Sequence, residues 1–102
     1  MKSIDTLTKH ISQWGKDRQI TINGRPIGQA IKTLEETTEL LDAINSNNKA
    51  EVIDAIGDIY VTLVMVAETS GLDISSCIES AYEEIKDRTG HLTIEGVFVK
   101  DE

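Results

Sequence analysis

The sequence predicts an all-α domain with the architecture of a four-helix bundle. Apolar residues recur every three or four positions along most of the 102-residue chain, which is the periodicity of amphipathic helices. Short breaks separate four such segments, and short connections are typical of helical bundles. A chain of this length fits one domain, so we expect residues 1–102 to fold as a single unit.

The first predicted helix covers about residues 3–16 and carries one apolar stripe. The stripe consists of Ile4, Leu7, Ile11 and Trp14. A loop is predicted to follow from Gln19, because Asn23-Gly24 is a turn signal and Pro26 suits the first turn of a helix.

The second and fourth predicted helices are amphipathic as well. The second covers about residues 26–44, and its inward side is predicted to hold Ile27, Ile31, Leu34, Thr38 and Leu41. The fourth begins at a cap formed by Asp73 or Ser75 and stops at Gly90, with Ile74, Ile78, Ala81, Tyr82 and Ile85 inward. The tail, residues 90–102, has alternating apolar residues that suit an extended conformation.

The third predicted helix, about residues 48–69, is apolar on nearly every side between Ile59 and Ala67. A helix that is apolar all round must be buried all round, which three neighbouring helices hardly achieve. We therefore expect a homodimer or homotetramer formed through the second and third helices. The alternative is that this helix is the central helix of a monomeric bundle.

The composition of the chain limits its possible binding partners and its cellular compartment. The 18 acidic and 10 basic residues give a net charge of −8, which argues against nucleic acid and anionic membrane surfaces as partners. The first ten residues have no apolar region typical of a signal peptide, and the one cysteine fits a reducing compartment. We therefore expect a cytoplasmic protein.

Two acidic stripes stand out on the second and third helices. The first consists of Glu35, Glu36 and Glu39, and the second of Glu51, Asp54 and Asp58. Carboxylates that face each other across two helices repel, and a divalent cation offsets this cost. Oxygen ligands without His or Cys favour Mg²⁺ or Mn²⁺ over Zn²⁺, and Mg²⁺ also accepts phosphate oxygens. The alternative is that both stripes are solvated surfaces.

These residues also carry a family resemblance. The segment "LEETTELLDAI", residues 34–44, resembles the EExxE motif of the MazG-like, all-α nucleoside triphosphate pyrophosphohydrolases. The segment "EVIDAIGDIYVTLVMVA", residues 51–67, resembles the helix that carries their ExxD motif. The resemblance extends to residues 14–18 and to residues 84–102, whose sequence is similar to short MazG-like proteins of phages and bacteria.

The resemblance implies a reaction and a set of residues. Members of the family hydrolyse a (d)NTP to a (d)NMP and pyrophosphate with Mg²⁺, for which Mn²⁺ is a substitute. The implied catalytic residues are Glu35, Glu36, Glu39 and Asp58. Glu36, Glu39 and Asp58 correspond to metal ligands, and Glu35 to a ligand or a base that orients water.

The chain departs from the ExxD motif at one position. Ala55 stands where the family has a glutamate, three residues before Asp58. Either Asp54 supplies the missing carboxylate, or Glu51 and Asp54 form a shifted ExxD to which Asp58 is added. The two explanations are compatible, because these carboxylates share one helical face.

Several further residues allow two interpretations. Lys32 either forms an i,i+4 ion pair with Glu36 or contacts phosphate. Lys86 and Arg88 either complement a helix dipole or bind phosphate. Trp14 is expected in the core, with stacking on a base as the alternative. Gly57 costs about 1 kcal/mol against alanine in a helix, which close helix packing would explain. A different class of function also fits: a non-catalytic acidic helical module for interaction or oligomerisation.

Overall fold

The structure is a computed structural model that describes residues 1–102, and it confirms the predicted all-α class. The elements are α1 (Ile4–Asp17), α2 (Ile20–Asn23), α3 (Pro26–Asn45), α4 (Lys49–Thr69), α5 (Ile74–Ile85), β1 (Gly90–Leu92) and β2 (Phe98–Lys100). The loop predicted from Gln19 is wrong in part, because it contains the short helix α2. Gln19 takes a left-handed conformation with φ of 62°, and the chain at once forms another helical turn that ends at Gly24.

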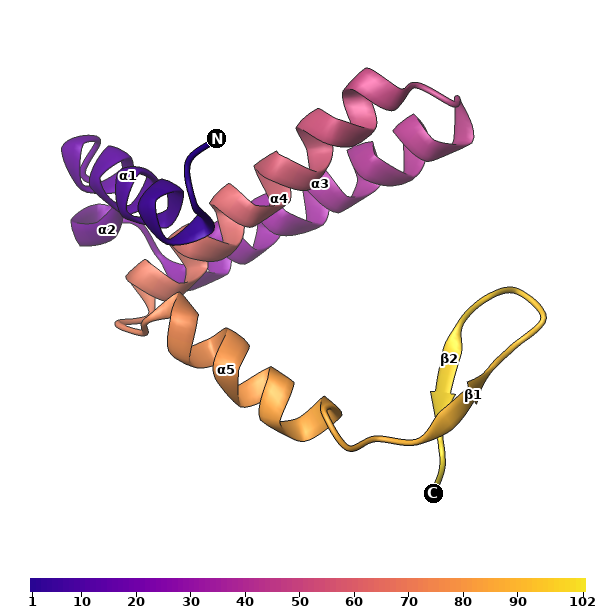
Figure 1. Ribbon diagram of the computed structural model, residues 1–102. Helices are drawn as coiled ribbons and strands as arrows, with labels where there is room; N and C mark the ends of the chain where they lie inside the picture. The colour runs from indigo at the N-terminus through magenta and orange to yellow at the C-terminus, as the bar shows by residue number, and fades with distance from the viewer.

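Helices α3 and α4 form the long helical hairpin at the centre of the molecule (Figure 1). Asn47 has a φ of 53°, a left-handed conformation that asparagine tolerates better than most residues. The backbone N–H groups of Asn47 and Asn48 donate to the carbonyls of Ile44 and Ala43. The Asn48 side chain then accepts from the backbone N–H of Glu51 at 3.2 Å and caps α4. These contacts place the acidic segments before and after the turn side by side.

The core lies around the second half of α4, where α1 and α2 pack. Val64 and Met65 are its largest fully buried side chains. Gly15 of α1 allows this packing, because a Cβ at that position would lie 2.6 Å from the Met65 sulfur. The run from Ile59 to Ala67 is therefore largely covered within one chain, and Leu63 is its exposed member. Oligomerisation stays a prediction, but the burial of this run within one chain removes it as an argument for contacts between copies.

The apolar side of α3 was predicted to face inward, and this prediction is wrong. Leu34 is 68% exposed, and Ile27, Ile31 and Leu41 are exposed as well. Helix α3 instead presents small and polar side chains to α4. Ala43 is buried, and the Thr33 hydroxyl donates to the Thr62 hydroxyl at 2.8 Å.

Helix α5 and the β-hairpin extend away from the rest of the molecule as an arm, residues 74–100 (Figure 1). Among the other elements, α5 contacts only α4, and the hairpin contacts none. The two strands pair antiparallel, with Gly90 opposite Lys100 and Leu92 opposite Phe98, so part of the tail is extended as expected. None of the helices has the length and hydropathy needed to cross a bilayer.

Candidate metal centre

A cleft of about 420 Å³ lies between α3 and α4, in the half of the helical hairpin next to its turn. Its lining residues are Glu36, Glu39 and Asp42 from α3, and Glu51, Asp54, Ala55 and Asp58 from α4. The hairpin brings the two sets together because its turn joins the end of α3 to the start of α4. Spacings of three and four residues keep the members of each set on nearby parts of their helix.

Glu36 has the most perturbed carboxyl group of the cleft. Its pKa is raised from 4.5 to about 7, first by a hydrogen bond with the Glu39 carboxyl group and then by desolvation. The negative charges of Glu39 and Asp58 raise the pKa further, and Lys32 lowers it slightly. One oxygen of Glu36, Oε2, is buried without a hydrogen-bond partner. The group therefore lacks a donor or a cation on that oxygen.

Asp58 is the second half-buried carboxyl group, and it comes from the opposite helix. Desolvation is the main cause that raises its pKa, followed by the negative charges of Asp54 and Glu39 and a hydrogen bond with Asp54. Carboxylates from α3 and α4 thus repel one another across the cleft. A positive charge between them would relieve this repulsion.

The residues present fit a hard divalent cation. Six carboxylates line the cleft, no basic side chain does, and the buried Glu36 oxygen has no hydrogen-bond partner. Carboxylate oxygens are the ligands that Mg²⁺ and Mn²⁺ accept. In the structure the carboxylates stand along an open cleft, and no three of them converge into a closed metal-binding group.

The structure separates the remaining predicted site residues from this cleft. Glu35 lies outside the cleft. Its carboxylate forms an ion pair with the Lys32 ammonium group at 3.1 Å. The hydrogen bond from this pair, and then the negative charge of Glu35, raise the pKa of Lys32. Lys86 pairs with Glu83 at 2.7 Å, and it follows the last residue of α5. Neither Lys86 nor Arg88 lines the cleft.

Asp42 is a lining residue that the sequence analysis missed. It stands three residues after Glu39, so it continues the α3 stripe by one turn, and this spacing was the available signal. Ala55 is buried at the same cleft, where a glutamate would have reached the other carboxylates. Asp54 and Glu51 both line the cleft beside Asp58, so both explanations of the missing ExxD glutamate fit the geometry.

A second pocket, of about 400 Å³, adjoins the cleft because Glu36 and Asp58 line both. Its other lining residues are Trp14, Ile20, Gln29, Lys32, Val61, Thr62 and Met65. Trp14 is 41% exposed, and the Arg18 guanidinium lies 4.5 Å from the centre of its ring. The prediction that Trp14 packs in the core is therefore only partly right, since the indole forms a wall of this pocket.

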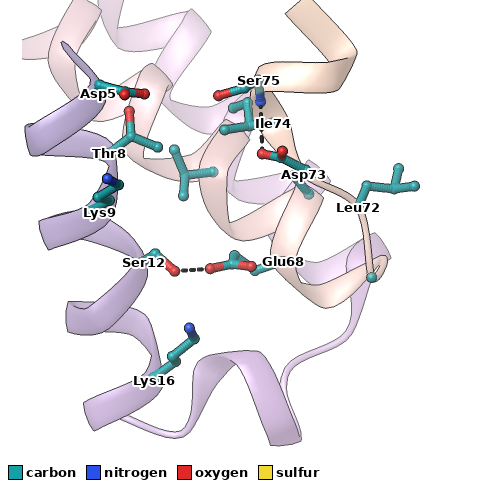
Figure 2. A pocket seen from close by; sticks show the side chains of 13 residues that line it. Asp5, Thr8, Lys9, Ser12, Lys16, Glu68, Leu72, Asp73, Ile74 and Ser75 are labelled. Carbon is teal, nitrogen blue, oxygen red and sulfur yellow. Dashed lines mark hydrogen bonds between the residues drawn. The ribbon is translucent and has the colours of Figure 1, made fainter.

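A larger cavity, of about 620 Å³, lies between α1, the end of α4 and the start of α5 (Figure 2). Charges of both signs line it, including Lys9 and Lys16. The Ser12 hydroxyl donates to the Glu68 carboxylate, and Asp73 accepts from the backbone N–H of Ser75 (Figure 2). These carboxylates bind groups of the protein itself, which is typical of a structural joint.

The fold and the cleft define a small all-α protein with a carboxylate-lined cleft between its two longest helices. Residues 29–93 match the family described as the MazG nucleotide pyrophosphohydrolase domain. The chain belongs to this family, and the resemblance drawn from the two acidic motifs is confirmed.

A phage protein is also similar to this chain. It is the uncharacterized 18.2 kDa protein in the rep-hol intergenic region of Haemophilus phage HP1 (strain HP1c1), with 34% identity over 73 residues. The similarity covers 72% of this chain and 45% of the phage protein, so the chain spans less than half the length of that relative. No solved structure matches the chain.

Proposed function

We propose that this protein is a Mg²⁺-dependent nucleotide pyrophosphohydrolase that converts a (d)NTP and water to a (d)NMP and pyrophosphate. The observation that carries the proposal is the cleft between α3 and α4, where carboxylates of both family motifs meet and one Glu36 oxygen has no partner. Membership of the MazG family supports the same reaction.

Each carboxylate has a proposed role. Glu36 and Glu39 from α3, and Asp54 and Asp58 from α4, are proposed as the metal ligands, with Glu51 as a further one. Mg²⁺ bound there, or Mn²⁺ in its place, would neutralise phosphate charge and activate a water molecule for attack.

Glu35 differs from these carboxylates because it lies outside the cleft. Its ion pair with Lys32 favours a role in positioning that cation toward phosphate over direct metal binding.

The neighbouring pocket is the proposed site for the nucleoside. It opens beside Glu36 and Asp58, so a nucleotide whose phosphates reach the cleft could extend into it. The exposed part of the Trp14 ring offers a stacking surface, and the Gln29 amide offers both a donor and an acceptor to a base. Lys32 stands in the same pocket, where its ammonium group suits phosphate.

Lys86 and Arg88 are also proposed phosphate ligands, but they lie on the arm and not at the cleft of their own chain. They would have to reach a cleft through movement of the arm or from another copy in a homodimer or homotetramer. The one cysteine fits a reducing compartment, and we propose a cytoplasmic location.

Pyrophosphate release from a panel of NTPs and dNTPs, with Mg²⁺ and with EDTA, tests the proposal. We expect release of pyrophosphate and the monophosphate only with the metal. Mg²⁺ at about 100 times its Kd should also stabilise the fold by roughly 2.7 kcal/mol, measured by thermal denaturation. No release from any nucleotide, with no Mg²⁺-linked rise in melting temperature, would favour the non-catalytic interaction module instead.

A further inference from the structure

Arg18 is a basic side chain that has no role in the proposed reaction. It directly follows the last residue of α1, and its guanidinium carbon lies 4.5 Å from the centre of the Trp14 ring. Its Nη1 atom donates a hydrogen bond to the backbone carbonyl of Trp14 at 3.1 Å. The guanidinium is therefore bound to the backbone of the same residue whose ring it covers, which restricts where it can lie on that ring.

This guanidinium lies on an aromatic ring in a chain that is rich in carboxylates. The chain has 18 acidic residues, yet Lys32 and Lys86 are the two cations that form ion pairs, and Arg18 forms none. The adjacent carboxylate, that of Asp17, accepts from the Gln13 amide at 2.8 Å instead. A guanidinium is attracted to the face of an indole and is less strongly hydrated than an ammonium group. The indole is therefore the partner of this side chain.

The Trp14 side chain is less restricted than the backbone that carries it. The next residue, Gly15, packs against Met65 so closely that a Cβ there would lie 2.6 Å from the Met65 sulfur. This packing holds α1 beside the pocket, while the Trp14 side chain stays 41% exposed. A half-exposed ring can change its side-chain rotamer unless a neighbour restrains it. Arg18 is in a position to supply this restraint.

The two residues differ in their relation to the pocket beside the cleft. Trp14 lines this pocket, and Arg18 does not. The guanidinium therefore covers a side of the ring that is turned away from the pocket, and the pocket side of the indole stays free. Planar rings stack on an indole in offset or edge-to-face arrangements. A nucleobase in the pocket can therefore contact the ring without displacing Arg18.

We propose that Arg18 is a positioning residue for the nucleobase, because it holds the Trp14 indole in place as a wall of the pocket. This inference rests on the proposed function, in which the pocket receives the nucleoside of a (d)NTP. Arg18 acts only through Trp14, since it lines neither the carboxylate cleft nor the pocket. The alternative is that Arg18 only complements the dipole at the end of α1.

Intrinsic fluorescence tests the proposal directly, because Trp14 is the one tryptophan of the chain. Titration with non-hydrolysable (d)NTP analogues in the presence of Mg²⁺ should quench the fluorescence of the wild-type protein as the base stacks. Arg18→Gln should lower the fluorescence anisotropy of the free protein, because the ring gains mobility. It should also raise the Kd of the nucleotide about two- to fivefold, the range expected for one exposed cation–π contact. The Kd of inorganic tripolyphosphate, which has no base, should not change.

Lys16→Gln is the matched control. It removes a cation from the last turn of α1, but Lys16 lines the cavity between α1 and α5 and not the pocket of Trp14. Both side chains are exposed, so circular dichroism should show the helix content of the wild type in both variants. Lys16→Gln should keep the wild-type anisotropy and nucleotide Kd.

Three results would overturn the proposal while nucleotide binding itself stands. An equal loss of affinity for tripolyphosphate would mean that Arg18 contacts phosphate. An equal loss in Lys16→Gln would mean that the charge at the end of α1 is the cause. Unchanged anisotropy and nucleotide Kd in Arg18→Gln would mean that Trp14 needs no restraint. If no nucleotide binds the wild-type protein, the proposed function and this inference fall together, and that result is distinct from the other three.

Discussion

Helix α3 has two faces that differ in chemistry and in surroundings. The face toward α4 carries Glu36, Glu39 and Thr33, whereas the face away from α4 carries exposed apolar residues such as Ile31 and Leu34. An ordinary surface helix has the reverse arrangement, with its apolar stripe against the rest of the protein. Helix α3 therefore uses its contact with α4 to build a polar cleft and leaves its apolar stripe exposed.

The largest effect is expected from a substitution in the acidic face, by which we mean the carboxylates that line the cleft between α3 and α4. Asp58→Asn keeps the shape of the side chain but removes one of the charges that we propose bind the metal ion. Pyrophosphate release with Mg²⁺ should fall at least about a hundredfold, because stabilisation of the transition state is lost. The mass by light scattering should not change, since Asp58 lines the cleft and is not part of the exposed apolar face of α3.

A variant on the opposite, apolar face of α3 provides the converse test. Leu34→Glu should change the mass and leave the Mg²⁺-linked rise in melting temperature in place, because Leu34 lies outside the cleft. If Asp58→Asn also dissociated the protein, the two faces would not be independent.

The sequence predicted the helices and most of the cleft because both depend on local spacing. The stretch from Glu35 to Asp58 contains both motifs and the turn between them, so the helical hairpin alone brings Glu36 near Asp58. Helix boundaries agree to within a few residues for the same reason, since caps such as Asn48 and Asp73 are local.

The orientation of α3 and the position of the arm could not be predicted in this way. Periodicity shows that Ile31 and Leu34 share a face, but it does not show which partner covers that face. The direction of α5 depends on the backbone angles of Gly71 and on the turn around it. Lys86 and Arg88 allow two interpretations from the sequence, phosphate binding or a contact with the helix dipole, and their place on the arm depends on this turn.

A smaller loss of activity should show which carboxylate replaces the glutamate that is missing at Ala55. If Asp54 replaces the missing glutamate, Asp54→Asn should lower pyrophosphate release at least about tenfold, equivalent to 1.4 kcal/mol. An equal loss in Glu51→Gln would favour the shifted motif, and loss at Asp54 alone would favour simple replacement. Asp42→Asn serves as the comparison for the lining residue found only in the structure. Unchanged activity in all three variants would mean that the ligand set is smaller than proposed.

The pH dependence of stability should distinguish the two faces, because only the acidic face titrates. A native pKa of about 7 for Glu36, against 4.5 ordinarily, means that the folded protein binds an extra proton between these values. Stability from this group is fully present below pH 4.5 and is lost as the pH rises through about 7. Without metal, Glu36→Gln should therefore gain melting temperature relative to wild type at pH 8 but not near pH 4.

Thermal denaturation across that range, with EDTA, measures this difference. Added Mg²⁺ should reverse the trend for the wild type, because the cation binds the deprotonated carboxylates and its affinity rises with pH. Leu34→Glu is not a suitable control here, since it introduces a new carboxyl group. Leu34→Gln is suitable, and its melting temperature relative to wild type should not vary with pH in this way.

The smallest expected effect concerns Gly57, which precedes Asp58 on α4. The structure leaves this position open, since an added Cβ would meet no atom within 4 Å, so close helix packing does not explain the glycine. Gly57→Ala should therefore stabilise the helix by about 1 kcal/mol and raise the melting temperature by roughly 4–8 °C. Gly28→Ala is the matched control, because Gly28 is equally open and lies in the first turn of α3, away from the cleft. If both variants are stabilised but only Gly57→Ala loses activity, substrate approaches the backbone beside the acidic face. If Gly57→Ala is destabilised while Gly28→Ala is not, the added methyl group meets atoms that the single chain does not supply, which would favour a contact between copies at this part of α4.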